Sequence, residues 1–92
     1  MDNINNDTLN EPLRDENPHR YTYMMLDRLR TDCKYFLGNG NGQVKYLQQL
    51  NVTDQIAYMR ELWNKLPQDG KPDWISLEQI AEHERQMIAK LN

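Results

Sequence analysis

The residues that could do chemistry together are few, and the glycine-rich run at 38–42 is the most distinctive group. Its sequence, Gly-Asn-Gly-Asn-Gly, favours positive φ angles and leaves little side chain to pack. Backbone N–H groups in such a run, ahead of a helix, can cradle a phosphate. The dinucleotide fingerprint needs a preceding strand, and a P-loop needs a final Gly-Lys-Ser/Thr, so neither fits. We expect a turn between two helices, with an anion or partner site as the alternative.

A second candidate is the run His-Glu-Arg-Gln-Met at 83–87, which begins like a zinc metalloprotease motif. That motif needs a second imidazole one turn later, and Met87 occupies the position. Only His19, His83 and Cys33 could add nitrogen or sulfur ligands, whereas a structural zinc site takes four ligands. We expect no bound metal and no other cofactor, with His83 on the solvated face of its helix.

Nucleophilic catalysis has equally little support in the sequence. Cys33 is the single cysteine, so it forms no internal disulfide, which suits a reducing cytosol. It lies among apolar residues at helical spacing, where a thiol packs as a small hydrophobe with a raised pKa. No spacing nominates a Ser-His-acid triad. We therefore expect the protein not to be an enzyme.

Basic and aromatic residues allow a nucleic-acid surface as an alternative. Arg20, Arg30 and Lys34 can share one side of a helix, with Lys45 beyond the glycine run, and nearby tyrosines could stack on bases. However, Asp27 interrupts the same face, and residues 19–92 have ten basic against nine acidic residues. The simpler interpretation is that the tyrosines edge the core with their hydroxyls in water.

The two tryptophans are the natural candidates for a protein-binding anchor. In a domain of this size both can belong to the core, but one that is exposed would anchor a binding patch. We therefore predict a protein-contact surface at the glycine turn, its flanking tyrosines and the tryptophans. Its residues are Tyr35, Asn39, Gly40, Asn41, Tyr46, Trp63 and Trp74.

These residues belong to a chain of 92 residues, which has room for one small domain. Apolar residues make up 38 % and charged residues 27 %, enough apolar material for one core. No run of about eighteen apolar residues is present, so no membrane span is expected. The first residues also lack the basic start and apolar run of a secretory signal.

The charge is concentrated at the N-terminus. Residues 1–18 carry five acidic residues against one arginine, a balance of −4, and few large aliphatic side chains. Such a segment cannot bury enough surface to offset the entropy of ordering. We predict a disordered acidic tail at 1–18 and a single helical domain at 19–92. An acidic arm that docks on a basic partner is the alternative interpretation of the tail.

Apolar residues spaced three and four apart predict helices rather than strands. The first helix should run from about Arg20 to Leu37, end at Gly38, and bury one apolar face. That face contains Met25, Leu26, Leu29, Cys33, Phe36 and Leu37. A short helix should follow the glycine run, with Val44, Leu47 and Leu50 on one side.

Two further helices are predicted after it. The third should run from about Asp54 to Leu66, with Thr53 as N-cap. The fourth has a capping box of Ser76 and Gln79, and its apolar face holds Leu77, Ile80, Ala81, Met87, Ile88 and Leu91. Short connections favour antiparallel neighbours. The predicted fold is all-α: a small compact bundle of three main helices plus one short helix, with a disordered N-terminal tail.

Three motifs in this order resemble a known family. They are Tyr-Phe-Leu-Gly-Asn-Gly-Asn-Gly at 35–42, Met-Arg-Glu-Leu-Trp at 59–63 and Trp-Ile-Ser-Leu-Glu-Gln-Ile at 74–80. Over about residues 20–88 the chain resembles the eleventh group of the large polyvalent protein-associated domains. Such domains occur in very long proteins of phages, plasmids and conjugative elements, and are thought to accompany invading DNA and help it establish. The resemblance carries over no catalytic residues.

The resemblance and the missing catalytic set together predict a non-enzymatic protein-interaction module of a bacterial mobile genetic element. Its partner would be a host or element-encoded protein, met in the bacterial cytoplasm and without membrane attachment, in counter-defence or establishment. The alternative is an accessory nucleic-acid-binding protein that uses Arg20, Arg30, Lys34 and Lys45.

Overall fold

The computed structural model describes residues 18–91, and within that range the chain is helical and contains no strand. The prediction of an all-α bundle with three main helices is confirmed. The tail predicted at 1–18 lies outside the described residues, apart from Pro18. The elements are α1 (Arg20–Leu37), the 3-10 turn η2 (Val44–Tyr46), α2 (Val52–Lys65), the 3-10 turn η3 (Gln68–Gly70) and α3 (Leu77–Lys90).

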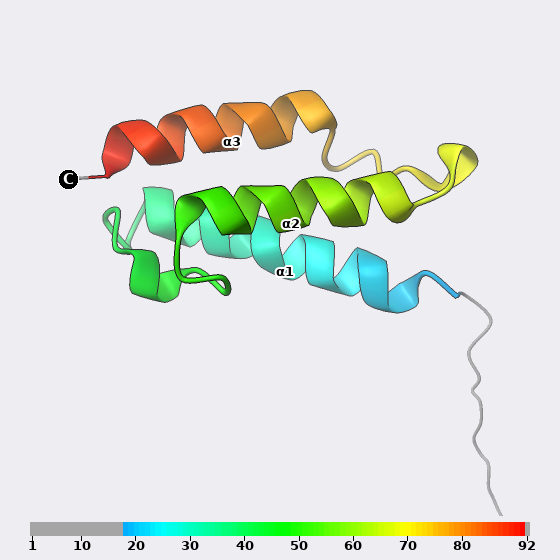
Figure 1. Ribbon diagram of the computed structural model, residues 1–92, viewed down its shortest axis with the longest axis horizontal. Helices are drawn as coiled ribbons and strands as arrows, with labels where there is room; N and C mark the ends of the chain where they lie inside the picture. The colour runs from blue at the N-terminus through cyan, green and yellow to red at the C-terminus, as the bar shows by residue number, and fades with distance from the viewer. Residues whose placement is uncertain (1–17, 92) are drawn as a thin grey trace, which may run out of the picture.

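The three helices form an up-down-up arrangement in which each packs against the other two. Figure 1 shows α2 returning alongside α1 and α3 returning alongside α2, so that α1 and α3 run in the same direction. The antiparallel neighbours expected from the short connections are therefore present. The glycine run lies at one end of the bundle, and the connection from α2 to α3 lies at the other (Figure 1).

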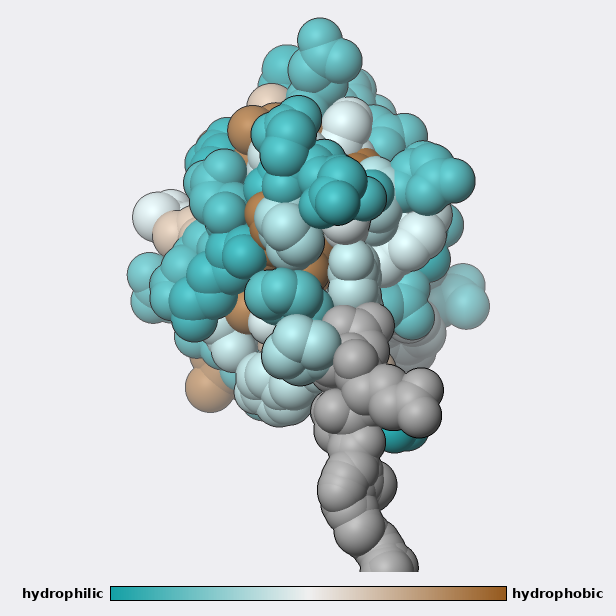
Figure 2. Space-filling model, turned by 90° about the vertical axis from the view of Figure 1, so that its right-hand side faces the viewer, coloured by the Kyte–Doolittle hydropathy of each residue, from teal (hydrophilic) through white to brown (hydrophobic). Residues whose placement is uncertain are grey.

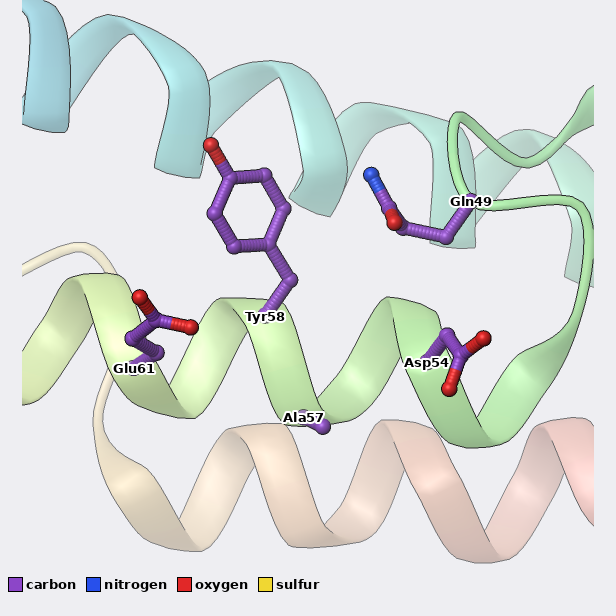
Figure 3. Close-up of a pocket in the computed structure, with 5 residues that line it drawn as sticks. All are labelled: Gln49, Asp54, Ala57, Tyr58 and Glu61. Carbon is purple, nitrogen blue, oxygen red and sulfur yellow. The ribbon is translucent and has the colours of Figure 1, made fainter.

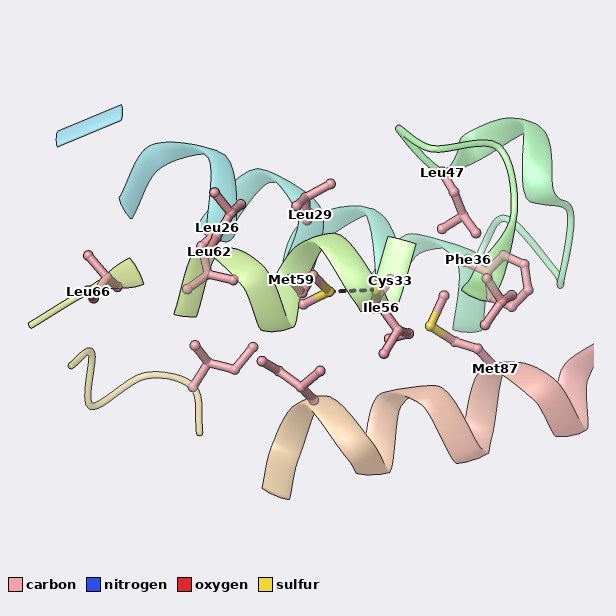
Figure 4. Close-up of a cluster of buried hydrophobic side chains, with 13 residues drawn as sticks. Leu26, Leu29, Cys33, Phe36, Leu47, Ile56, Met59, Leu62, Leu66 and Met87 are labelled. Carbon is pink, nitrogen blue, oxygen red and sulfur yellow. Dashed lines mark hydrogen bonds between the residues drawn. The ribbon is translucent and has the colours of Figure 1, made fainter. Parts of the chain in front are cut away.

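The core sits where one apolar row from each helix meets (Figure 4). Cys33 lies in it, with its Sγ atom 3.6 Å from Met59 Sδ. Burial, and then the negative charge of Asp32, raise the pKa of the Cys33 thiol to about 12. The prediction that Cys33 packs as a small hydrophobe is thus confirmed. The core residues are Leu26, Leu29, Cys33, Phe36, Leu47, Val52, Ile56, Met59, Leu62, Leu66, Ile75, Ile80 and Met87.

Helix α2 begins earlier than predicted, and Thr53 is not its N-cap. The cap is Asn51, whose side-chain oxygen accepts a hydrogen bond from the Asp54 backbone N–H at 2.7 Å. Asparagine caps a helix at least as well as threonine does. Val52, directly after the cap, is buried in the core, so packing favours the earlier start.

The short helix predicted after the glycine run is only a three-residue 3-10 turn, Val44–Tyr46. Of its three predicted apolar residues, Leu47 is buried, whereas Val44 and Leu50 are exposed. Leu50 has a φ of 65°. Its N–H donates to the Leu47 carbonyl, so the chain turns there before it enters α2, and no longer helix forms.

Helix α3 begins with the predicted capping box, in which Ser76 and Gln79 bond reciprocally at 2.8 and 3.1 Å. Its apolar face is narrower than predicted. Only Ile80 and Met87 within the helix are buried, and four other predicted members are exposed. The reason is that α3 contacts α1 and α2 along one row, and no further described element covers its outer row. The exposed members are Leu77, Ala81, Ile88 and Leu91.

Candidate functional site

Trp63 is part of the structural framework of the bundle. It is half-buried against the core, and its indole Nε1 donates a hydrogen bond to the Ile75 carbonyl at 3.1 Å. The Lys71 ammonium lies 4.3 Å from the centre of its ring. That ammonium also donates to the carbonyls of Trp63 and Leu66, at 2.8 and 2.5 Å. These bonds satisfy backbone carbonyls at the end of α2. Because the Trp63 ring is also packed against the core and covered by Lys71, little of its surface is left for a partner.

Trp74 is the exposed tryptophan. Its residue is 37 % accessible, and the Arg30 guanidinium lies 5.0 Å from the centre of its ring. Arg30 is held from its other side by an ion pair with Asp27 at 2.8 Å. A cation over an aromatic face contributes about 0.5–1 kcal/mol at an exposed site. Trp74 is therefore exposed and also held in one orientation, as a binding anchor needs to be.

The Trp74 side chain forms part of the wall of a surface hollow of about 500 Å³. It is lined by Tyr23, Met24, Asp27, Arg30 and Trp74, and the Tyr23 hydroxyl donates to the Gly70 carbonyl at 2.5 Å. This bond ties α1 to the connection between α2 and α3. The hollow is therefore built from two segments that are far apart in the sequence.

A smaller hollow of about 170 Å³ adjoins the first, because Met24 lines both. Its other lining residues are Tyr21, Met25 and Arg28. We call the two hollows together the Trp74 face. Figure 2 views the molecule from the end where α1 begins, and hydrophobic residues reach the surface there between hydrophilic ones. The face is thus mixed, with apolar side chains surrounded by charged ones.

The glycine run caps helix α1. The N–H groups of Gly38, Gly40 and Gly42 donate to carbonyls of the last turn of α1, at 2.7–3.1 Å. A Cβ atom on Gly40 would stand 2.9 Å from the Tyr35 carbonyl oxygen. The run is therefore a turn, as expected, and these three amides are already used by the helix. An anion that used these three amides would have to displace their bonds to the helix end.

Two tyrosines flank the glycine run and form a second exposed aromatic group. The rings of Tyr35 and Tyr46 meet edge to face with centroids 5.0 Å apart, and the Lys45 ammonium lies 5.2 Å from the Tyr46 ring centre. Asn39 and Asn41 are exposed beside them. This group lies where α1 ends, whereas Trp74 lies against Arg30 near the middle of that helix, on the connection between α2 and α3. The residues predicted to form one contact surface are therefore split between two places.

Of the four cations of the nucleic-acid alternative, Arg30 and Lys34 share one neighbour, His83, whereas Lys45 lies on a different element. Arg30 faces Trp74 and Asp27, whereas Lys45 lies over Tyr46, on an element that packs near Tyr35. Arg20 and Lys34 are exposed on α1. Arg30 lies near the middle of α1 and Lys45 lies beyond its end, so a phosphate backbone would have to run along the second half of α1 to contact both.

His83 is half-buried, so the prediction of a solvated position is wrong. Burial lowers its pKa, and the positive charges of Lys34 and Arg30 lower it further. Within the described part of the chain, His83 Nε2 and Arg30 Nε are buried without a hydrogen-bond partner. The reason is that His83 lies on the side of α3 that packs towards α1, where two cations already stand. A neutral imidazole fits this position.

The outer side of α2 carries a third hollow, of about 340 Å³ (Figure 3). Asp54 and Glu61 lie at its two ends, with Ala57 and Tyr58 between them. Asp54 accepts a hydrogen bond from the Asn51 side chain at 2.8 Å, and Glu61 pairs with Lys65 at 3.6 Å. The carboxylates do not converge, so the hollow lacks the paired acid and base that hydrolysis would need.

Across residues 18–91, no three His, Cys, Asp or Glu side chains gather in a way that could hold a metal ion. In the same range, none of the helices is long and apolar enough to cross a membrane.

The sequence did not predict Met24 and Arg28 as site residues, and it suggested Tyr21 only as one of the tyrosines that could stack on bases. They lie outside the apolar row of α1, so the helical periodicity assigns them to solvent. The available signal was that Tyr21 and Met24 are large apolar residues at positions where a solvated helix face normally carries polar ones.

A family model described as Large polyvalent protein-associated domain 11 matches residues 19–87 of the chain. Neither the curated proteins nor the solved structures contain a significant match. The matched range covers all three helices apart from the last residues of α3.

Proposed function

The chain belongs to the Large polyvalent protein-associated domain 11 family, and on this premise we propose that it is a non-enzymatic protein-interaction module of a bacterial mobile genetic element. It acts in the bacterial cytoplasm by binding a protein of the host or of the element, in counter-defence or in establishment of the incoming DNA.

The observation that carries this proposal is the Trp74 face. An exposed tryptophan held by Arg30, next to exposed Tyr21 and Met24, combines the residue types that dominate the energy of protein interfaces. Large apolar side chains on an exposed helix face lower the solubility of a protein. Their grouping at one place is typical of a contact surface. A protein partner would cover them.

The non-enzymatic part of the proposal is supported by the positions of the candidate nucleophile, base and acids. Among the described residues, these side chains do not meet at one site. Cys33 is buried and its pKa is raised, which removes it as a nucleophile at neutral pH. His83 Nε2 has no hydrogen-bond partner among the described residues. The carboxylates around the α2 hollow are engaged locally with Asn51 and Lys65.

Affinity capture with the immobilised full-length chain tests the proposal. Bacterial lysate is passed over the wild-type chain and two variants, and bound proteins are quantified by mass spectrometry. Trp74→Ala removes the anchor of the Trp74 face, whereas Tyr46→Ala removes a similarly exposed aromatic beside the glycine run. We expect a protein whose recovery falls about tenfold or more with Trp74→Ala and stays unchanged with Tyr46→Ala.

Two outcomes contradict the proposal. If no protein is enriched by the wild-type chain at micromolar concentration, the interaction role fails. If the chain instead shifts labelled DNA, with an affinity that falls steeply as salt rises, the nucleic-acid alternative replaces it.

A further inference from the structure

The Trp74 face presents an apolar centre. Tyr21 and Met24 are 63 % and 60 % exposed, and Met24 lines both hollows. Methionine is unbranched and polarisable, so it adapts to the shape of an inserted side chain. The larger hollow, of about 500 Å³, has room for one bulky side chain of a partner.

The rim of this centre is rich in arginine. Arg28 lines the smaller hollow, and Arg20 lies one turn before Met24 on the same side of α1. Among residues 18–91, neither arginine has a carboxylate within ion-pair distance. As far as residues 18–91 are concerned, both guanidinium groups are therefore open to an incoming carboxylate.

Nearby acidic side chains do not cancel this charge. Asp27 is neutralised by Arg30 at 2.8 Å, and Glu61, whose charge reaches Tyr58 beside Tyr21, pairs with Lys65 at 3.6 Å. Asp73, which precedes Trp74, is exposed. Its single negative charge is smaller than the two positive charges of Arg20 and Arg28. Counted over the described residues alone, the charge balance at the face is positive, although the whole chain has a net charge of −3.

The geometry favours a peptide over a nucleic acid. Arg30 covers one face of the Trp74 ring at 5.0 Å, which removes a stacking surface that a base would use. Guanidinium groups bind carboxylates in a bidentate manner, and the apolar centre matches a hydrophobic side chain better than a sugar-phosphate backbone.

We propose that the Trp74 face binds an acidic segment of a partner protein. A bulky apolar side chain of that segment enters the hollow against Met24 and Trp74, and its flanking carboxylates pair with Arg20 and Arg28. This inference rests on the proposed function, because it names the chemistry of the partner that the same face recognises.

Fluorescence anisotropy with two synthetic peptides tests it. Both carry a neutral fluorophore and a central Leu-Trp-Leu, which is flanked by glutamates in one peptide and by lysines in the other. We expect the full-length chain to bind the glutamate peptide, with an affinity that falls as salt rises. Trp74→Ala and Arg28→Glu should each weaken binding about tenfold or more. Lys45→Glu, which reverses a charge beside the glycine run, should leave it unchanged.

Circular dichroism of each variant separates lost binding from lost folding, and Arg28→Gln provides a milder variant if Arg28→Glu unfolds the chain. Equal or tighter binding of the lysine peptide overturns the inference. So does a concentration-dependent dimer in sedimentation that disappears with Trp74→Ala, because a second copy would then be the occupant. If neither peptide binds but lysate capture still depends on Trp74, this inference fails and the proposed function stands.

Discussion

Gly40 illustrates how one residue can be determined by its neighbours. It is buried, and a Cβ atom there would stand 2.9 Å from the Tyr35 carbonyl oxygen and 3.1 Å from the Cα atom of Phe36. Both are backbone atoms of the last turn of α1, so they cannot move aside cheaply. The close approach lets the Gly40 N–H donate to Tyr35 at 2.7 Å. The turn and the helix end thus require each other.

Gly40→Ala should therefore destabilise the fold by about 1–3 kcal/mol, because the methyl group forces the loop off the helix end. Urea unfolding followed by circular dichroism measures the change. Gly38→Ala is the matched control, since the nearest atom to its added Cβ is the Lys34 carbonyl oxygen at an ordinary 3.4 Å. Equal stability of the two variants would show that the turn does not need glycine at position 40.

Single residues of the site were predictable in type but not in place. The sequence identified Trp63 and Trp74 as alternatives for an anchor, and only the structure separates them. Trp63 shares a turn with Leu62 on a core helix, so its burial follows from periodicity. The exposure of Trp74 depends on where the connection at 66–76 crosses α1, which is set by long-range contacts such as Tyr23 to Gly70.

At the scale of the elements, the start of α2 depends on two adjacent features. Asn51 caps the helix, and its side-chain amide also donates to the Asp54 carboxylate at 2.8 Å. Thr53 lies inside the first turn and is exposed. The cap and the burial of Val52 together place the boundary two residues before the predicted one.

Asn51→Ala should cost about 1 kcal/mol of folding free energy, because it leaves an N-terminal amide without its acceptor. Thr53→Ala should change stability by less than about 0.5 kcal/mol, as for most exposed positions without a cap role. Chemical denaturation of both variants measures this difference. A larger loss of folding free energy for Thr53→Ala than for Asn51→Ala would contradict Asn51 as the N-cap and favour Thr53.

Helix α3 offers a comparison within one helix and one residue type. Ile80 is fully buried, whereas Ile88 is 54 % exposed, although both belong to the apolar set predicted from sequence. Ile80→Ala should cost about 2–5 kcal/mol, since it opens a cavity in the core. Ile88→Ala should cost less than about 1 kcal/mol. Thermal and urea unfolding of both variants test the burial, and similar losses would mean that the outer row of α3 is covered.

Periodicity predicted the helices well, because spacings of three and four fit only one regular structure. It predicted which row of α1 is buried, since polar residues occupy most of the opposite side. It failed for α3, where two adjacent apolar rows exist and the number of packing partners decides which row is used. It also failed at Val44 and Leu50, where so short a segment lacks the length to stabilise a helix.

At the scale of the whole molecule, the α1–α3 contact makes stability depend on pH. Burial and the charges of Lys34 and Arg30 lower the pKa of His83, and the opposing charge of Glu82 is a smaller effect. Below the ordinary histidine pKa of about 6.5, the unfolded chain takes up a proton that the folded chain resists. This contribution therefore leaves stability intact above about pH 6.5 and reduces it as the pH falls.

His83→Gln should make the free energy of unfolding less sensitive to pH between about 7 and 5, because glutamine does not titrate. Urea titrations of wild type and variant across that range measure the slope. His19→Gln, which changes the other histidine of the chain and leaves His83 in place, is the control. An unchanged slope in His83→Gln would mean that the imidazole is readily protonated in the folded chain.

The parallel direction of α1 and α3 also determines how this domain would sit in a longer polypeptide. The chain enters beside Arg20 and leaves beside Lys90 at the far side, about 27 Å away for an 18-residue helix. A domain joined after α3 would therefore stand at the end of the bundle where α1 ends, away from Tyr21 and Met24 near the start of α1. Fusion at the carboxyl side should leave recognition by the Trp74 face unchanged.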